Sequence, residues 1–158
     1  MNPAIKLVNR QRKRRLDLRA CQTFAEVAVA RVRMRNRQVV LPDDICVFFV
    51  SDARIRRIHR HFLAVDEATD VITFHHGEIF ISVETAERHA QQFSTSLAEE
   101  IHLYIVHALL HLAGFEDKTQ RGYGRMKVAQ DKVVHEIEHA LALRGAQRGI
   151  SPQRHSAA

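Results

Sequence analysis

One apolar helix constrains the fold of this chain more than any other feature of its sequence. Residues 97–113 are apolar on nearly every side of the predicted helix, which places it inside the molecule rather than on the surface. Gly114 follows as the residue that ends such a helix in a left-handed conformation. The longest apolar stretch, residues 101–114, contains three histidines and is too short to cross a membrane. We therefore expect a core helix and no association with a membrane.

Shorter apolar segments around this helix predict a small sheet. Strands are expected at residues 5–9, 45–51, 71–74 and 78–83. Helices are expected at residues 16–32, 52–62, 84–93, 97–113 and 120–144. Gly77 suits the turn of a hairpin between the last two strands, and Asp52 is a competent N-cap residue for the second helix. Because the strands precede most of the helices, we predict an α+β fold with a small mixed sheet of about four strands, covered by about five to six helices.

The length of 158 residues suits one compact domain, which we place at residues 1–145. Residues 146–158 contain Gly, Pro, Ser and Arg without periodicity, so we expect a disordered tail there. The sequence shows no secretion signal, and Cys21 and Cys46 lie in apolar surroundings without C-x-x-C spacing. These features favour a cytoplasmic protein with free thiols.

The basic residues are concentrated at one end of the chain. Residues 1–37 contain eleven Lys or Arg and two acidic residues, a net charge of +9, whereas the remainder is slightly acidic. The densest run is Arg12, Lys13, Arg14 and Arg15. Such a block is typical of a surface that binds the phosphate backbone of a nucleic acid. The alternative is a solvated surface that only aids solubility.

Two pairs of histidines have the four-residue spacing that brings two imidazoles to one face of a helix. One pair, His135 and His139, lies in the sequence HEIEH, which matches the zinc-peptidase pattern H-E-x-x-H. The apolar residues of that helix lie on its opposite side, so we expect this pair to be exposed to solvent, without a third ligand. We interpret it as part of a charged helix surface.

The other pair, His107 and His111, lies in the apolar helix. Two imidazoles that project from a buried helix in one direction need a shared partner, because an unpaired buried polar group is costly. The turn at Gly114 returns Glu116 and Asp117 towards the histidines. Two histidines and one carboxylate form a known ligand set of catalytic zinc, so we predict a metal site here. A pair of hydrogen-bonded core histidines is the alternative.

The stretch HALLHLAGFED at residues 107–117 resembles the signature H-G-x-L-H-L-x-G-Y-D-H of the YbeY family of bacterial endoribonucleases. TDVITF at residues 69–74 and GEIFIS at residues 77–82 are similar to two further family motifs, and the resemblance covers about residues 4–144. It implies a metal-dependent, single-strand-specific endoribonuclease that acts in maturation of the 16S rRNA 3′ end and in ribosome quality control. The implied partners are single-stranded RNA or rRNA and the ribosome or ribosomal proteins.

The sequence departs from the family pattern at two places. Asp117 stands where the signature has its third histidine, so the resemblance implies one Zn²⁺, or another divalent ion, held by His107, His111 and Asp117. Leu63 stands where the family has an arginine implicated in activity. Arg57 or Arg60, on the preceding helix, could substitute for that guanidinium.

The resemblance assigns no general base; Glu78 and Glu100 are the nearest candidates by motif and by helix face. A metallopeptidase or another zinc hydrolase is an alternative, although no glutamate lies between His107 and His111. A ribosome-associated protein with a structural metal is a second alternative, if Leu63 and Asp117 have abolished catalysis.

Overall fold

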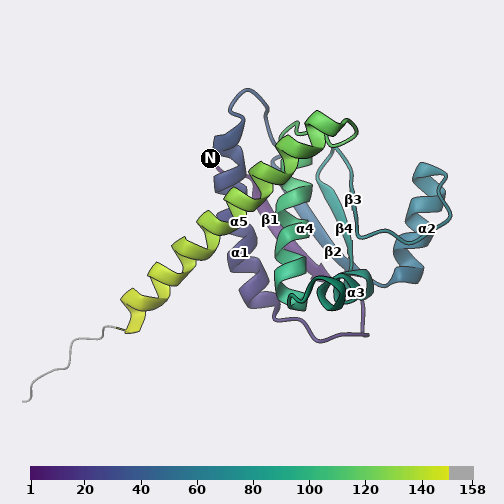
Figure 1. Cartoon of the computed structure of the whole chain (residues 1–158), viewed down its shortest axis with the longest axis horizontal. Coiled ribbons are helices and arrows are strands. Elements are labelled where there is room, and N and C mark those ends of the chain that lie inside the picture. The colour runs from purple at the N-terminus through teal and green to yellow at the C-terminus, as the bar shows by residue number, and fades with distance from the viewer. Residues whose placement is uncertain (150–158) are drawn as a thin grey trace, which may run out of the picture.

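The structure is a computed structural model that describes residues 1–149. Four strands and five helices are present in this part of the chain (Figure 1). In chain order they are β1 (Ala4–Asn9), α1 (Leu18–Arg35), β2 (Asp44–Val50), α2 (Asp52–Leu63), β3 (Val71–Thr73), β4 (Glu78–Ser82), α3 (Val83–Phe93), α4 (Leu97–Leu112) and α5 (Gln120–Gly149). No helix among them is both long and apolar enough to cross a membrane.

The strands form one mixed sheet in the order β1-β2-β4-β3. β1, β2 and β4 are parallel, and β3 pairs with β4 in the antiparallel direction. The hairpin turn between β3 and β4 depends on Gly77, whose φ is +110° and whose added Cβ would lie 2.5 Å from the carbonyl oxygen of Asp44. The predicted α+β fold, with its mixed sheet and its hairpin, is confirmed.

Side chains alternate between the two faces of the sheet, as the period of two in a strand requires. Val47 and Ile79 are register partners on β2 and β4, and both are fully buried in the main core. The next partners, Phe48 and Phe80, belong to a smaller cluster on the opposite face, where their rings stack with centroids 5.0 Å apart. The sheet therefore has apolar side chains on both faces.

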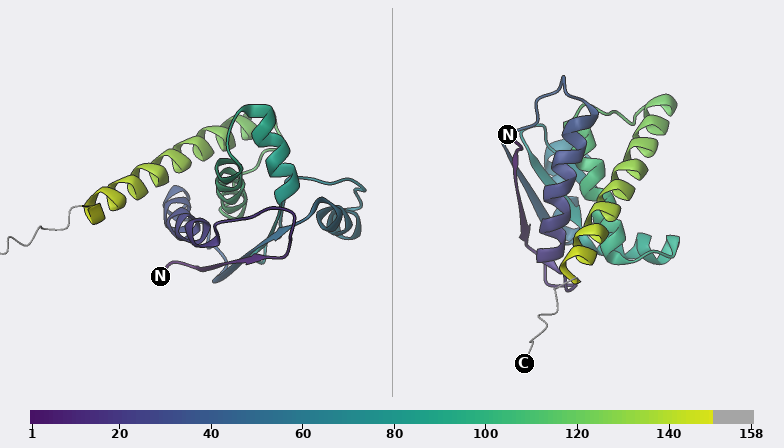
Figure 2. Two further views of the ribbon diagram at one scale, coloured as in Figure 1. Left: turned by 90° about the horizontal axis from the view of Figure 1, so that it is seen from below. Right: turned by 90° about the vertical axis from the view of Figure 1, so that its left-hand side faces the viewer.

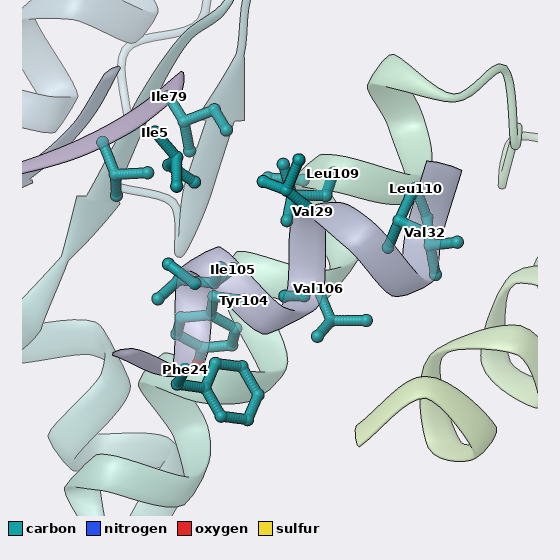
Figure 3. Packing of buried hydrophobic residues seen from close by; sticks show 14 of the residues in the cluster. Ile5, Phe24, Val29, Val32, Ile79, Tyr104, Ile105, Val106, Leu109 and Leu110 are labelled. Atoms are coloured by element: carbon teal, nitrogen blue, oxygen red, sulfur yellow. The ribbon is translucent and has the colours of Figure 1, made fainter. Parts of the chain in front are cut away.

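The helices form two layers over the main-core face of the sheet. Figure 2 shows α1 and α4 nearer the sheet and α5 lying across both of them on the outside. Figure 3 shows the mainly apolar contact between the two helices, where Phe24, Val29 and Val32 of α1 approach α4 residues Tyr104, Ile105, Leu109 and Leu110. The predicted core helix is therefore confirmed. Its packing fixes the positions of its few polar residues.

α2 lies away from α1, α4 and α5 and contacts α3 (Figure 1). Its only buried residue, Ile55, packs with Val50 and Ile72 in the smaller cluster on the opposite face of the sheet. The prediction that Asp52 caps α2 is wrong, because Ser51 is the N-cap residue and accepts from the backbone of Arg54. Asp52 instead accepts hydrogen bonds from the hydroxyls of Ser82 and Thr85 and pairs with Arg88, which joins α2 to α3.

α5 extends beyond the predicted helix end at residue 144 and continues to Gly149. Residues 150–158, which make up most of the predicted disordered tail, lie outside the described part of the chain.

Candidate metal centre

The C-terminal half of α4 presents His107 and His111 on one side of the core helix. The helix begins with a capping box in which Ser96 and Glu99 satisfy each other's backbone N–H groups. Both imidazoles are half-buried, with side-chain exposures of 24% for His107 and 27% for His111. This degree of burial leaves each ring accessible while packing restricts its orientation.

The turn after α4 brings Asp117 back to these histidines. Gly114 adopts a φ of +89°, and the N–H groups of Gly114 and Phe115 donate to the last carbonyls of α4, each over 3.0 Å. Asn36, the C-cap residue of α1, holds the turn from the other side, because its Nδ2 donates to the carbonyl of Ala113 over 3.0 Å. The chain therefore reverses within a few residues.

The start of α5 also packs closely against this turn. A Cβ added at Gly122 would lie 2.6 Å from the carbonyl oxygen of Glu116, next to Asp117. Thr119 accepts from the N–H of Gly122 through its hydroxyl oxygen at 3.0 Å. A glycine is thus required for α5 to begin this close to the carboxylate-bearing turn.

Three donor atoms converge at the site. His107 Nε2 and His111 Nε2 lie 3.1 Å apart, and each lies 3.5 Å from Asp117 Oδ2. Among residues 1–149 these three form the one group of His, Cys, Asp or Glu whose ligand atoms are close enough to hold a metal ion. The structure thus brings together the three residues that the sequence and the resemblance single out, while Glu116 is exposed and outside the group.

A hydrogen bond on the far side of the His107 ring defines which of its nitrogens carries the proton. His107 Nδ1 lies 2.9 Å from Gln130 Oε1, an acceptor, so Nδ1 is the donor and Nε2 carries a lone pair. The Nε2 lone pair of His107 therefore faces His111 Nε2 and a carboxylate oxygen of Asp117.

This arrangement fits a divalent cation. Three electron-rich atoms at contact distance repel one another unless a positive charge lies between them. Donors bound at about 2.0–2.1 Å around a tetrahedral zinc ion lie roughly 3.3 Å from one another. The observed separations of 3.1 and 3.5 Å are close to that value.

The lowered pKa of His111 also favours a bound cation. Burial lowers the pKa of His111, and the neighbouring His107 lowers it further, against the opposing effects of Asp117 and of the Phe115 backbone. The neutral imidazole is the form that binds a metal.

Gln130 is the functional residue that the sequence analysis misses. It lies on α5 in register with the buried residues Met126, Val133 and Ile137, so it is a polar exception on an apolar stripe. The same signal identifies His107 and His111 on α4. Applied to the long helix, that signal would have identified Gln130 as well.

The third histidine of the apolar stretch has a different environment. His102 stacks on Phe24 of α1 with ring centroids 3.9 Å apart, and its Nε2 is buried without a hydrogen-bond partner among the described residues. Burial lowers its pKa. His102 therefore belongs to the α1–α4 packing and not to the site.

The other histidine pair is exposed, as predicted. His135 and His139 both lie on the solvent side of α5. Glu136, the residue that the zinc-peptidase pattern would use as general base, pairs with Arg35 of α1 instead. No third ligand accompanies this pair in the part of the chain that the structure describes.

The two candidate general bases have other contacts. Glu78 is exposed and pairs with His76 over 2.9 Å. Glu100 is buried and accepts a hydrogen bond from the hydroxyl of Thr95 over 2.7 Å. Neither belongs to the three-residue cluster.

The arginines that could replace the family's guanidinium are on α2. This helix packs on the face of the sheet opposite α4, and Arg60 lies 3.9 Å from Asp66 rather than beside the cluster. Leu63, at the family's arginine position, is 52% exposed at the end of the same helix. The structure does not bring Arg57 or Arg60 to the histidines.

The basic run lies in the loop between β1 and α1. Arg12, Lys13, Arg14 and Arg15 are all exposed. Buried Gln11 shapes the loop by donating to the carbonyl of Arg14 over 2.8 Å, and Arg14 pairs with Glu87 of α3. The run is thus a fixed basic surface beside α3.

Comparison with known proteins identifies the family. The family model described as endoribonuclease YbeY matches residues 6–138. The chain is 37% identical to endoribonuclease YbeY of Bacteroides fragilis over an alignment of 98 residues. This alignment covers 58% of this chain and 70% of the relative. It is 31% identical over 104 residues to endoribonuclease YbeY of Chlorobium phaeobacteroides, covering 61% of this chain and 75% of the relative.

A solved structure agrees with the fold. The solution structure of TM1509 from Thermotoga maritima superposes with a TM-score of 0.62 at 25% identity, covering 96% of this chain and 99% of that protein. The family match spans both the histidine helix and the hairpin of the sheet. The chain therefore belongs to the YbeY endoribonuclease family.

Proposed function

We propose that this protein is a zinc-dependent endoribonuclease, a hydrolase that cleaves phosphodiester bonds in single-stranded RNA. Its role would be in rRNA processing, at the 16S 3′ end, and in ribosome quality control in the cytoplasm, with the ribosome or ribosomal proteins as partners. Membership of the family supports the class of reaction. The observation that carries the metal dependence is the convergence of two imidazole nitrogens and one carboxylate oxygen at 3.1 and 3.5 Å.

His107, His111 and Asp117 would hold one Zn²⁺ per chain. Bound there, the ion supplies positive charge that polarises a phosphoryl oxygen and lowers the pKa of a coordinated water. Gln130 holds the Nδ1 proton of His107, so His107 Nε2 stays available as a ligand. Asp117, in place of the family's histidine, reduces the net positive charge of the loaded site.

The basic loop would bind the RNA backbone. Arg14 is paired with Glu87, whereas Arg12, Lys13 and Arg15 have no carboxylate partner within residues 1–149. Three unpaired cations on a loop that Gln11 holds in place suit a row of phosphates. Binding should therefore weaken as salt concentration rises.

A metallopeptidase is not favoured. The pair that contains the required glutamate is exposed on α5 and lacks a third ligand in the described chain. The pair that has a third ligand contains no glutamate between its histidines.

The test compares one histidine from each pair. Purified parent protein should cleave single-stranded RNA and lose this activity when a chelator removes the metal. His111→Ala should abolish cleavage with little change in melting temperature, because the imidazole is only half-buried. His139→Ala is the matched control and should cleave like the parent, since His139 is exposed. Full activity of His111→Ala, or no activity of the metal-loaded parent on any single-stranded RNA, would overturn the proposal.

A further inference from the structure

A groove leads away from the metal cluster along α4. It encloses about 430 Å³ between α3, α4 and α5, and His107 forms part of its wall. Glu100 lines the groove seven residues before His107 on the same helix, which makes the groove about 10 Å long. The groove therefore adjoins the cluster at its His107 end, whereas His111 and Asp117 do not line it.

Aromatic side chains form the rim of this groove. Phe93, the last residue of α3, and Tyr123, in the first turn of α5, both line it, and each is 59% exposed. Phe93 continues a row of rings on α3 and α4, because His89 lies 5.8 Å from Phe93 and 6.1 Å from Tyr104 between ring centroids. Two large rings left open to solvent beside a cavity offer flat apolar faces to a flat ligand.

The polar side chains at the base of the groove differ in whether all their oxygen atoms already have hydrogen-bond partners. Glu100 is buried and accepts from the hydroxyl of Thr95, so it serves the fold. Asp70 is half-buried, and its Oδ1 accepts from the N–H of Val71 over 2.8 Å. Its Oδ2 has no hydrogen-bond partner among the described residues. Asp70 thus offers one free acceptor to a ligand.

We propose that this groove binds the base of the nucleotide next to the cleaved phosphate. The proposal rests on the endoribonuclease function described above and assigns a substrate subsite to it. The base stacks on Phe93 and Tyr123, and an N–H group on its edge donates to Asp70 Oδ2. Lys127, an exposed residue that lines the same groove from α5, would pair with a backbone phosphate.

The free carboxylate oxygen predicts a base preference. Adenine, cytosine and guanine each present an exocyclic amino group that can donate to Asp70. Uracil has a single ring N–H flanked by two carbonyl oxygens, which a carboxylate would repel. The groove should therefore favour the three amino-bearing bases over uracil.

Binding of nucleoside 5′-monophosphates tests the proposal directly. These probes contain no phosphodiester bond, so they can be titrated into the protein as purified and followed by NMR shifts or calorimetry. Ribose 5-phosphate controls for any contribution of the phosphate. AMP, CMP and GMP should bind at least several-fold more tightly than ribose 5-phosphate, with UMP weaker than the other three nucleotides.

Variants distinguish a loss of base binding from a loss of folding. Phe93→Ala and Tyr123→Ala should each weaken AMP binding by about tenfold, because each removes a stacking surface. Val128→Ala is the matched control: this residue is 56% exposed on α5 and does not line the groove. Asp70→Asn keeps an oxygen for the Val71 N–H and should reduce the difference between AMP and UMP.

Two outcomes would overturn the proposal: nucleotides that bind no more tightly than ribose 5-phosphate, or unchanged AMP binding in both aromatic variants. Cleavage of RNA without affinity for bases would reject the subsite and leave the endoribonuclease function intact. Base-dependent binding without cleavage of any RNA would support the subsite and reject the endoribonuclease function.

Discussion

The histidine pairs of α4 and α5 have the same spacing and opposite surroundings. On α5, His135 and His139 are exposed, and the intervening Glu136 pairs with Arg35. On α4, the Nε2 atoms of the two histidines lie 3.1 Å apart, facing a carboxylate. The α5 pair, whose sequence matches the zinc-peptidase pattern at every position, is therefore the less suitable metal site. A metal centre needs convergent donors in a shaped environment, and a sequence pattern on a helix specifies only the spacing.

Asp117→Ala should produce the largest effect of a single change that retains both α4 histidines. Loss of the hydrogen-bonding groups behind metal ligands typically costs about 10–100-fold in affinity, so removal of a ligand itself should cost well over tenfold. Zinc affinity, measured by competition with a chelator, checks this. Glu116→Ala is the matched control on the same turn and should bind zinc like the parent. If Asp117→Ala holds zinc as tightly as the parent, Asp117 is not a ligand.

Gln130→Leu should weaken zinc binding by about tenfold, at the lower end of the range for groups that orient a ligand. Leucine keeps much of the volume but removes the acceptor for His107 Nδ1–H, so the tautomer with a free Nε2 is no longer favoured. The same chelator competition measures the change. Gln130→Glu, which retains an acceptor, should restore most of the affinity. Equal losses in both variants would indicate a packing role for Gln130.

His102→Phe should reduce the sensitivity of stability to acid. Burial lowers the pKa of His102 from 6.5, so the unfolded state binds a proton more readily than the folded state. The resulting stability is present above the unfolded-state pKa and is lost as pH falls below it towards the folded-state pKa. Melting temperatures at about pH 7.5 and 5.5 should therefore differ less for His102→Phe than for the parent. An unchanged difference would show that His102 does not contribute to the acid sensitivity.

Glu136→Gln should have the smallest effect. The ion pair with Arg35 is partly exposed, with side-chain exposures of 28% for Arg35 and 39% for Glu136, so its loss should cost about 0–1 kcal/mol. Zinc content and RNA cleavage should not change. A clear loss of either would mean that the pattern on α5 has a function that the geometry does not support.

Features that depend on local periodicity could be predicted from the sequence. The core helix follows from apolar residues on all its sides, and the hairpin follows from two apolar segments separated by a turn with Gly77. The convergence of His107 and His111 follows from their spacing on a buried helix. Asp117 required the family resemblance, because Glu116 is equally compatible with the turn.

Features that depend on distant segments could not be predicted. Ser51 and Asp52 are both suitable N-cap residues, and the Asp52 carboxylate is instead bound by Ser82, at the end of β4, and by Thr85 and Arg88 of α3. The groove exists only because three helices meet beside His107. α5 also extends past Gly145, where the sequence predicts its end, because a single glycine lowers helix propensity without preventing a helix.

The most direct measurement is the metal content of two double variants, determined by elemental analysis of protein purified without added chelator. The account predicts about one zinc per chain for the parent and for the variant His135→Ala/His139→Ala. It predicts no stoichiometric zinc for His107→Ala/His111→Ala, with a circular dichroism spectrum like that of the parent. Retention of zinc by the α4 variant together with its loss from the α5 variant would contradict the central claim.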